Sequence, residues 1–145
     1  MGGDGETRLA AKDRRRLVHW HKGLGDSAAA DATSERVVWK SIDACTLVNV
    51  LIEVGADLLT ANDTNYADLV LTRWDAGGTG NVNVGSRSTK IVGGTGNWNA
   101  FRNEAFLALS NTAFANGQKL TLKIDKVGTG VIVPPFALVV EHTVD

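Results

Sequence analysis

Apolar and polar residues alternate along much of the chain after position 36. In residues 46–54 the alternation has a period of two and leaves one face strongly apolar. Shorter or less regular versions of the pattern cover residues 37–39, 66–74, 82–84, 120–124 and 136–144. Because the side chains of a β-strand point alternately to its two faces, each run predicts a strand with one buried face. The sequence therefore predicts an all-β protein with about seven or eight strands and no long helix.

Turn-forming residues separate these runs. Glycine occurs 16 times, and three Gly-Thr-Gly turns begin at residues 78, 94 and 128. Their unequal spacing indicates turn chemistry rather than an internal repeat. Asn116-Gly117 is a hairpin signal, and Pro134-Pro135 marks a strand edge or a crossing between sheets, because proline cannot donate to a central ladder. The predicted fold is an antiparallel β-sandwich with a jelly-roll-like arrangement.

The first 36 residues have a different composition. Glycines interrupt them at several points, and residues 27–34 are low in complexity. Residues 7–22 hold enough Leu, Ala, Lys and Arg for a short helix, although an isolated helix of that length is marginal in water. We therefore divide the chain into an extended basic N-terminal arm, residues 1–36, and a β-sandwich domain, residues 37–145, which we expect to fold without the arm.

The charge of the chain is distributed unevenly, although the formal net charge is only −1. Residues 1–40 hold 8 Lys and Arg against 6 Asp and Glu, whereas residues 41–145 hold 7 against 10. A basic arm on an acidic body suits an arm that reaches toward an acidic neighbour. The small net charge gives no global field that would draw the protein to nucleic acid or to an anionic membrane.

The most unusual segment of the arm combines basic and aromatic residues. It consists of Arg8, Arg14, Arg15, Arg16, His19, Trp20, His21 and Lys22. Arginine and tryptophan are favoured anchors of protein interfaces, so the segment is interpreted first as a docking site for a protein partner. Nucleic-acid binding through phosphate contacts and base stacking and a solvated run of charge are the alternatives. Asp13, Asp26 and Asp31 dilute the field that phosphate binding needs.

Motifs for catalysis or cofactor binding are weak. No glycine-rich loop continues as Gly-Lys-Ser/Thr or has the strand-to-helix context of a dinucleotide site. His19 and His21 could chelate a metal only from an extended segment, and the sequence shows no third ligand nearby. With His142, they are interpreted as surface or interface residues. We expect no enzymatic activity, no cofactor and no metal.

Two further features are interpreted as structural. The single cysteine, Cys45, opens an apolar run, where a small buried hydrophobe is favoured over a reactive thiol. An oxygen-rich cluster lacks the spacing of an EF-hand loop, and a turn closed by its own backbone hydrogen bonds is favoured over a Ca²⁺ site. The cluster consists of Asp57, Asn62, Asp63, Asn65 and Asp68.

Four aromatic residues of the body support an alternative function. If they were exposed together, they would form a platform for a carbohydrate or a receptor; they are Tyr66, Trp74, Trp98 and Phe101. Packing in a core or in a subunit interface is the commoner role of such residues and is favoured.

Five segments of the body carry a family resemblance: residues 62–67 (NDTNYA), 73–78 (RWDAGG), 116–124 (NGQKLTLKI), 126–131 (KVGTGV) and 137–141 (ALVVE). In these segments the chain resembles the small β-sandwich virion proteins of tailed bacteriophages, the capsid decoration or cement proteins and related head-fibre modules. The resemblance spans about residues 44–144. It implies a viral structural protein without catalytic residues.

The same resemblance implies how such a protein works. Decoration proteins are often trimeric and clamp neighbouring subunits of the major capsid protein on the outside of the shell, some of them with an extended terminal arm. Residues 1–36 would be that arm, and the partners would be the major capsid protein and further copies of the chain. No apolar run approaches the roughly 20 residues of a membrane span, and no secretion signal begins the chain. We therefore expect synthesis in the host cytoplasm and a final location on the virion surface.

Overall fold

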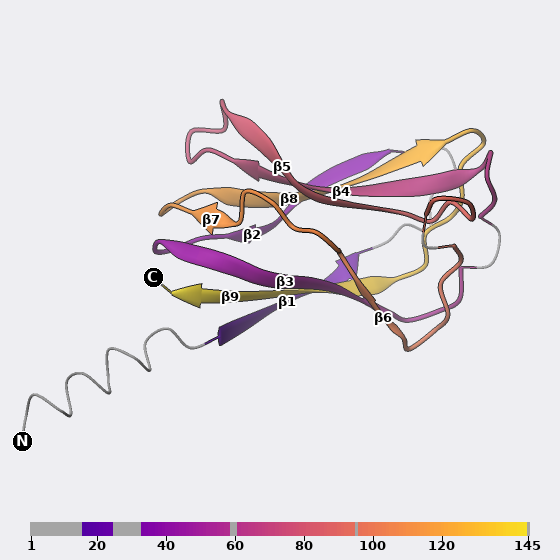
Figure 1. Cartoon of the computed structure of the whole chain (residues 1–145), viewed down its shortest axis with the longest axis horizontal. Helices are drawn as coiled ribbons and strands as arrows, with labels where there is room; N and C mark the ends of the chain where they lie inside the picture. Colours follow the sequence, from indigo (N-terminus) through magenta and orange to yellow (C-terminus); the bar gives the residue numbers. More distant parts are fainter. Residues whose placement is uncertain (1–15, 25–32, 59–60, 95, 145) are drawn as a thin grey trace, which may run out of the picture.

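The protein is built from two antiparallel β-sheets that pack face to face (Figure 1). The computed structural model describes residues 16–24, 33–58, 61–94 and 96–144. Within these ranges the chain forms nine strands and no helix. The prediction of an all-β sandwich is therefore confirmed. In the same ranges, no helix is long and apolar enough to cross a membrane.

The first sheet, sheet A, contains the strand that opens the described chain and the strand that ends it. Its order is β1-β9-β3-β6, and β7 pairs with β3 as well. The strands are β1 (Arg16–Leu24), β9 (Phe136–Val144), β3 (Cys45–Val54), β6 (Asn103–Ala105) and β7 (Ala113–Phe114). β1 thus forms one edge of this sheet, against β9.

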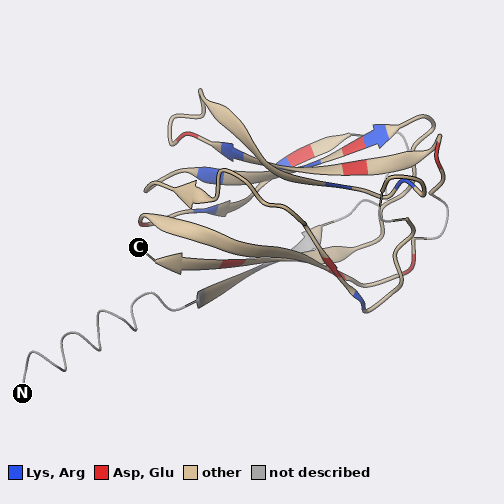
Figure 2. Ribbon diagram, in the orientation of Figure 1, with Lys and Arg blue, Asp and Glu red and all other residues tan. Residues whose placement is uncertain are grey.

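The second sheet, sheet B, has the order β2-β8-β4-β5. Its strands are β2 (Ser34–Lys40), β8 (Lys119–Val127), β4 (Tyr66–Trp74) and β5 (Asn81–Ser88). Most charged residues of the strands lie in sheet B, where both signs are interspersed (Figure 2). Because charges of opposite sign are interspersed, sheet B does not produce an electrostatic field of a single sign.

The pairing of the strands is nested around the turn between β4 and β5. β4 pairs with β5, β3 with β6, β2 with β8 and β1 with β9, all antiparallel. The pairs β9–β3 and β8–β4 then join these units into the two sheets. Strands far apart in sequence therefore lie side by side, and most of the pairing is long-range.

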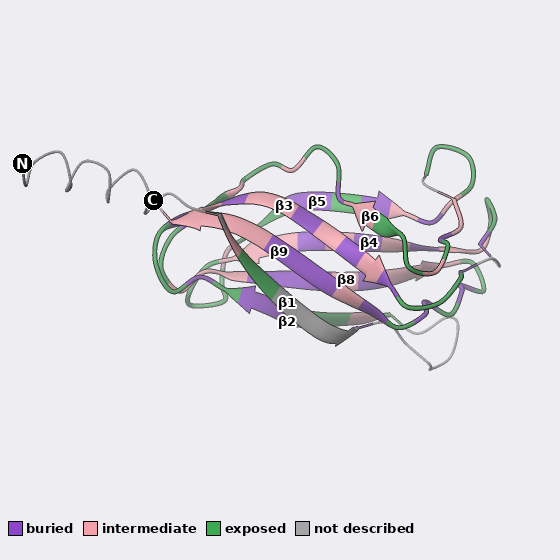
Figure 3. Ribbon diagram, turned by 90° about the horizontal axis from the view of Figure 1, so that it is seen from below, coloured by how far each residue is buried: buried purple, intermediate pink, exposed green. Residues whose placement is uncertain are grey.

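Inward-facing side chains of both sheets form one core. Burial alternates along β3 and β4, and Figure 3 shows the alternation on β3. Leu69 of β4 lies opposite Ile124 of β8, and Leu71 lies opposite Leu122; all four are buried. Each fully buried Leu or Ile contributes about 1.5–3 kcal/mol. The period-two runs of the sequence correctly predicted this core.

One flank of the sandwich is closed by the segment that contains β6. The chain after β6 runs beside β5: the Ser110 amide donates a hydrogen bond to the Val84 carbonyl oxygen at 2.8 Å. An ion pair between Arg87 of β5 and Glu104 of β6 joins the two sheets. Burial lowers the pKa of Arg87, and the charge of Glu104 opposes that shift. Removing one partner of a buried pair leaves an uncompensated charge, so this contact holds the flank shut.

The turn predictions agree with the structure at most positions. Gly78, Gly117 and Gly128 have φ values of 74°, 83° and 69°, a backbone region that favours glycine. The segment with Pro134-Pro135 carries the chain from β8 in sheet B to β9 in sheet A, so it is a crossing between sheets. β5 ends at Ser88, and residues 89–92 form a loop.

The structure changes the interpretation of the arm. Residues 16–24 are β1, not part of a helix over residues 7–22, because β9 supplies a partner for their backbone hydrogen bonds. Leu24 is buried in the core, and β2 already begins at Ser34. Deleting residues 1–36 would therefore remove an edge strand, a core side chain and part of β2. A deletion that tests the preceding segment alone has to stop at Arg15.

Candidate functional site

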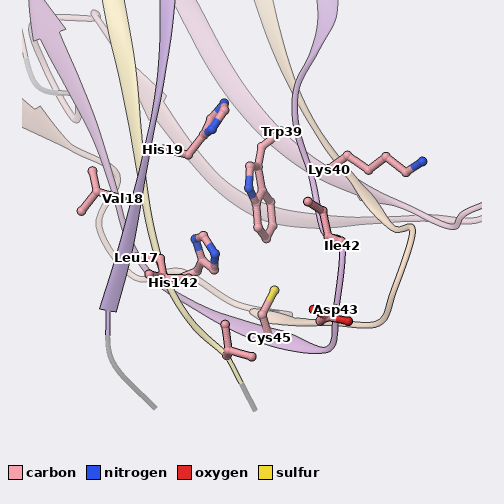
Figure 4. A pocket seen from close by; sticks show the side chains of 10 residues that line it. Leu17, Val18, His19, Trp39, Lys40, Ile42, Asp43, Cys45 and His142 are labelled. Carbon is pink, nitrogen blue, oxygen red and sulfur yellow. The ribbon is translucent and has the colours of Figure 1, made fainter. Parts of the chain in front are cut away.

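A pocket of about 440 Å³ opens at the end of the sandwich where β1 begins and β9 ends (Figures 1 and 4). We call it the end pocket. Strands of both sheets and the connection between β2 and β3 form its walls. The lining residues are Leu17, Val18, His19, Trp39, Lys40, Ile42, Asp43, Cys45, His142 and Val144.

Strand register places the histidines of the end pocket. Leu17 of β1 lies opposite His142 of β9, and His19 lies opposite Val140. Directly opposite residues share a face of the sheet, and Val140 is fully buried in the core. Leu17, His19 and His142 therefore lie on the inner face of sheet A, at its open margin.

Trp39 closes the pocket from the side of sheet B. The register of β2 shifts between Val37 and Trp39, and Trp39 is buried. Its ring centroid lies 4.8 Å from that of His142, with an interplanar angle of 47°, and 5.2 Å from that of Phe114 at 62°. Edge and tilted arrangements of this kind stabilise aromatic clusters by about 0.5–1.5 kcal/mol beyond area burial. The stack fixes the inner wall of the pocket.

His142 is the most perturbed titratable group at this site. Its Nδ1 atom is buried and has no hydrogen-bond partner among the described residues. Burial lowers the pKa of His142 below its ordinary value, and repulsion from the neighbouring His19 lowers it further. Burial in the apolar wall therefore favours the neutral form of the ring.

Exposed apolar side chains surround the mouth of the end pocket. Ile42 is 81% exposed and Val18 is 54% exposed. Lys40 and Asp43 add one charge of each sign, and Cys45 lies buried below them (Figure 4). Burial of Cys45 confirms the prediction that it packs as a small hydrophobe. Exposed apolar residues beside a cavity are typical of protein interaction sites.

The end pocket does not show metal-site geometry. His19, His142 and Cys45 lie on three adjacent strands, yet no group of three or more His, Cys, Asp or Glu side chains in the described ranges could hold a metal ion. What the arrangement offers instead is a recess with aromatic and aliphatic walls and polar groups at its margin. Such a recess accepts an apolar side chain.

The oxygen-rich cluster lies at the opposite end of the sandwich and is structural. Asn62 Oδ1 accepts hydrogen bonds from the amides of Thr64 and Asn65 at 2.9 and 2.8 Å. Asp63 Oδ1 accepts from the Val92 amide at 2.7 Å. Asn62 closes a turn and Asp63 joins two loops, as the turn interpretation predicted.

The predicted docking residues of the arm have different positions. Arg8, Arg14 and Arg15 lie outside the described residues. His19 lines the end pocket. The remaining ones belong to β1, where the structure defines their backbone as part of sheet A; they are Arg16, Trp20, His21 and Lys22.

The four aromatic residues proposed as a platform do not share a surface. Trp98 is 0% exposed and packs edge-on against Phe136 in the core, so it cannot contact a ligand. Phe101 is 85% exposed, and it lies in the loop that precedes β6. Tyr66 begins β4 and Trp74 ends it, so the length of the strand separates them. The platform as predicted is wrong for Trp98.

The sequence did not indicate Trp39 or Ile42 as site residues, and His142 was interpreted only as a surface or interface residue. Ile42 follows Ser41 and precedes Asp43 in a polar connection, and an apolar residue in such a turn was the one available signal. The stacking of Trp39 on His142 depends on the register of both sheets, which no local pattern encodes.

No family model matches the sequence, and no curated protein or solved structure matches it either.

Proposed function

We propose that this chain is a capsid decoration protein that binds the outer surface of a phage head. One observation carries the proposal: the end pocket and its exposed apolar rim lie at the point where the basic segment joins the sandwich. Val18 and His19 of that segment form one wall, and Ile42 of the body forms part of the rim. A partner that contacts this end meets both parts of the chain together.

The topology supports a virion role by analogy. Nested pairing of β1–β9, β2–β8, β3–β6 and β4–β5, in one five-stranded and one four-stranded sheet, supports the proposal of a jelly-roll-like arrangement. Capsid proteins and lectins both use jelly rolls, so the fold alone does not choose between them. The apolar rim favours a protein partner over a soluble ligand.

The proposed mechanism is anchorage through an edge strand. β1 is paired with β9 along most of its length, and the shift in its register lies between His21 and Leu24. Contacts of residues 1–15 with a capsid subunit would therefore be connected directly to β1, a paired strand of sheet A. Copies of the chain joined as a trimer would multiply weak contacts, since linked sites bind with high effective concentration.

A binding assay on phage heads tests the proposal. Heads stripped of the protein are mixed with the full chain or with a chain that starts at Arg16, and bound protein is measured by co-sedimentation. We expect the full chain to bind and the shortened chain, which keeps β1, to bind at least about tenfold more weakly. Equal binding of the two would refute the role of the N-terminal segment, and no binding of either would refute the function.

A further inference from the structure

A second recess lies on the outer face of sheet B, away from the end pocket. It has a volume of about 320 Å³. Residues of three adjacent strands and of the turn after β4 line it: Glu35, Arg36, Val37, Trp74, Gly78, Lys119 and Thr121. We call it the sheet B recess.

Strand register explains how the recess is built. Thr121 of β8 lies between Val37 of β2 and Thr72 of β4, and Lys119 lies opposite Trp74. β8 is thus the floor, with Val37 on one side and Trp74 on the other. Gly78 has no side chain, which leaves the edge next to the β4–β5 turn open.

A chain of hydrogen bonds fixes the polar groups of the recess. The indole Nε1–H of Trp74 donates to Thr121 Oγ1 at 3.0 Å, and the Thr121 hydroxyl donates to Glu35 Oε1 at 2.9 Å. Thr121 is buried, so this hydroxyl is a fixed link rather than a mobile surface group. The indole ring and the carboxylate are both held in place before any ligand arrives, which lowers the entropic cost of binding.

We propose that the sheet B recess binds a hexopyranose unit of an oligosaccharide. A pyranose has an apolar face of C–H groups, which an indole ring complements, and a rim of hydroxyls. Those hydroxyls can donate to the Glu35 carboxylate and accept from the Lys119 ammonium group. A concave site with an aromatic wall and a few fixed polar groups is the usual design for such ligands. This site is separate from the end pocket and does not depend on the capsid proposal.

The flanking charges indicate which sugars to compare. Lys119 is cationic, and Glu35 is anionic and already accepts one hydrogen bond. Arg36 also borders the recess, but it lies opposite the buried Leu122 of the inner face. Lys119 Nζ donates to the Ala76 carbonyl oxygen at 3.3 Å, which directs it toward the turn and leaves its other two protons for a ligand. A sugar carboxylate can pair with the Lys119 ammonium group, whereas a neutral sugar can only accept a hydrogen bond from it, so we expect uronic acids to bind more tightly than neutral sugars.

The test uses three defined hexasaccharides, namely cellohexaose, chitohexaose and hexagalacturonate. Each is titrated into the full chain while the indole N–H signals are followed by NMR. We expect the Trp74 signal to shift with at least one probe, most strongly with hexagalacturonate. Trp74→Ala lacks this signal, so the affinities of the variants are measured by isothermal titration calorimetry with the same probes. Trp74→Ala and Val37→Lys should each weaken binding by about tenfold or more. Val37 is half exposed and makes no structural hydrogen bond through its side chain, so its variant reports on the recess even if Trp74→Ala folds poorly.

Phe101→Ala is the matched control, because Phe101 is a more exposed aromatic residue in a different part of the fold. Its binding should equal that of the unaltered chain. The proposal is wrong if none of the three probes shifts the Trp74 signal, if the two recess variants bind as well as the unaltered chain, or if Phe101→Ala weakens binding as much as they do. Attachment to phage heads should be unchanged in Val37→Lys, so failure here is distinguishable from failure of the capsid proposal.

Discussion

The two ends of the sandwich are held together in different ways. At the end opposite the pocket, polar side chains join one loop to another: Asn65 Oδ1 accepts from the amide and the hydroxyl of Thr129, both at 2.8 Å. Asp57 Oδ1 accepts from the Ala100 amide at 2.5 Å. At the pocket end, Trp39 and His142 stack across the two sheets beside an open cavity.

This difference indicates what each end is suited to do. Hydrogen bonds from side-chain oxygens to backbone amides satisfy those amides and restrict the conformation of the loops. Aromatic packing beside a cavity leaves apolar surface in contact with water, which a partner can cover. Exposed apolar residues occur at both ends, but those around Ile42 border a recess that extends between the sheets. The following predictions test this comparison, from the largest effect to the smallest.

Replacing Trp39 should have the largest effect on stability. Trp39→Ala removes the ring that contacts both Phe114 and His142, so we expect a loss of about 3–5 kcal/mol in the free energy of unfolding. Urea denaturation measures it. Phe101→Ala is the control and should stay within about 0.5 kcal/mol of the unaltered chain. A small loss for Trp39→Ala would mean that aromatic packing does not hold the pocket end.

At the opposite end, removing one polar tie should have a moderate effect. Asn65→Ala leaves the Thr129 amide without its acceptor, and we expect a loss of about 1–2 kcal/mol. Thr129→Val removes the hydroxyl donor alone and should cost less, because the backbone hydrogen bond remains. If both variants were neutral in urea denaturation, these ties would not hold the loops.

Acidification should weaken the fold through His142, with the smallest effect. Its pKa is lowered in the folded protein, so the unfolded chain binds more protons below about pH 6.5. Neutral His142 therefore leaves the free energy of unfolding undiminished above that pH, and the free energy of unfolding decreases as the pH falls toward the pKa of His142 in the folded protein. Urea midpoints measured on either side of about pH 6.5 should show the fall, and His142→Phe should flatten it. An equal fall in that variant would assign the effect to other groups.

Local patterns predicted the strands that form the core, and they failed where pairing decides the structure. Residues 66–74 alternate clearly, and β4 has the bounds that the alternation predicts. β1 has a mixed set of basic and aromatic residues, and its extended conformation depends on β9, which lies more than 100 residues later in the chain. The local sequence of this segment does not tell whether it forms a helix or a strand, because the strand depends on a partner far away in the chain.

The site was predicted less well than the fold for a related reason. Trp98 lies between Asn97 and Asn99, so its neighbours suggest exposure, yet a bridge to Leu58 holds it in the core. Of the predicted docking segment, His19 lines the end pocket. Its counterparts Trp39 and His142 come from other strands and could be found only from the register of the two sheets.

The most direct test of the central claim compares two isoleucines in the head-binding assay. Ile42 is 81% exposed at the end pocket, and Ile132 is 52% exposed in the β8–β9 loop at the opposite end. The capsid proposal predicts that Ile42→Asp lowers the amount of protein bound per phage head by about tenfold or more, because the new charge would be buried against the shell. It predicts that Ile132→Asp binds like the unaltered chain. Equal binding by the two variants would contradict docking through the pocket end.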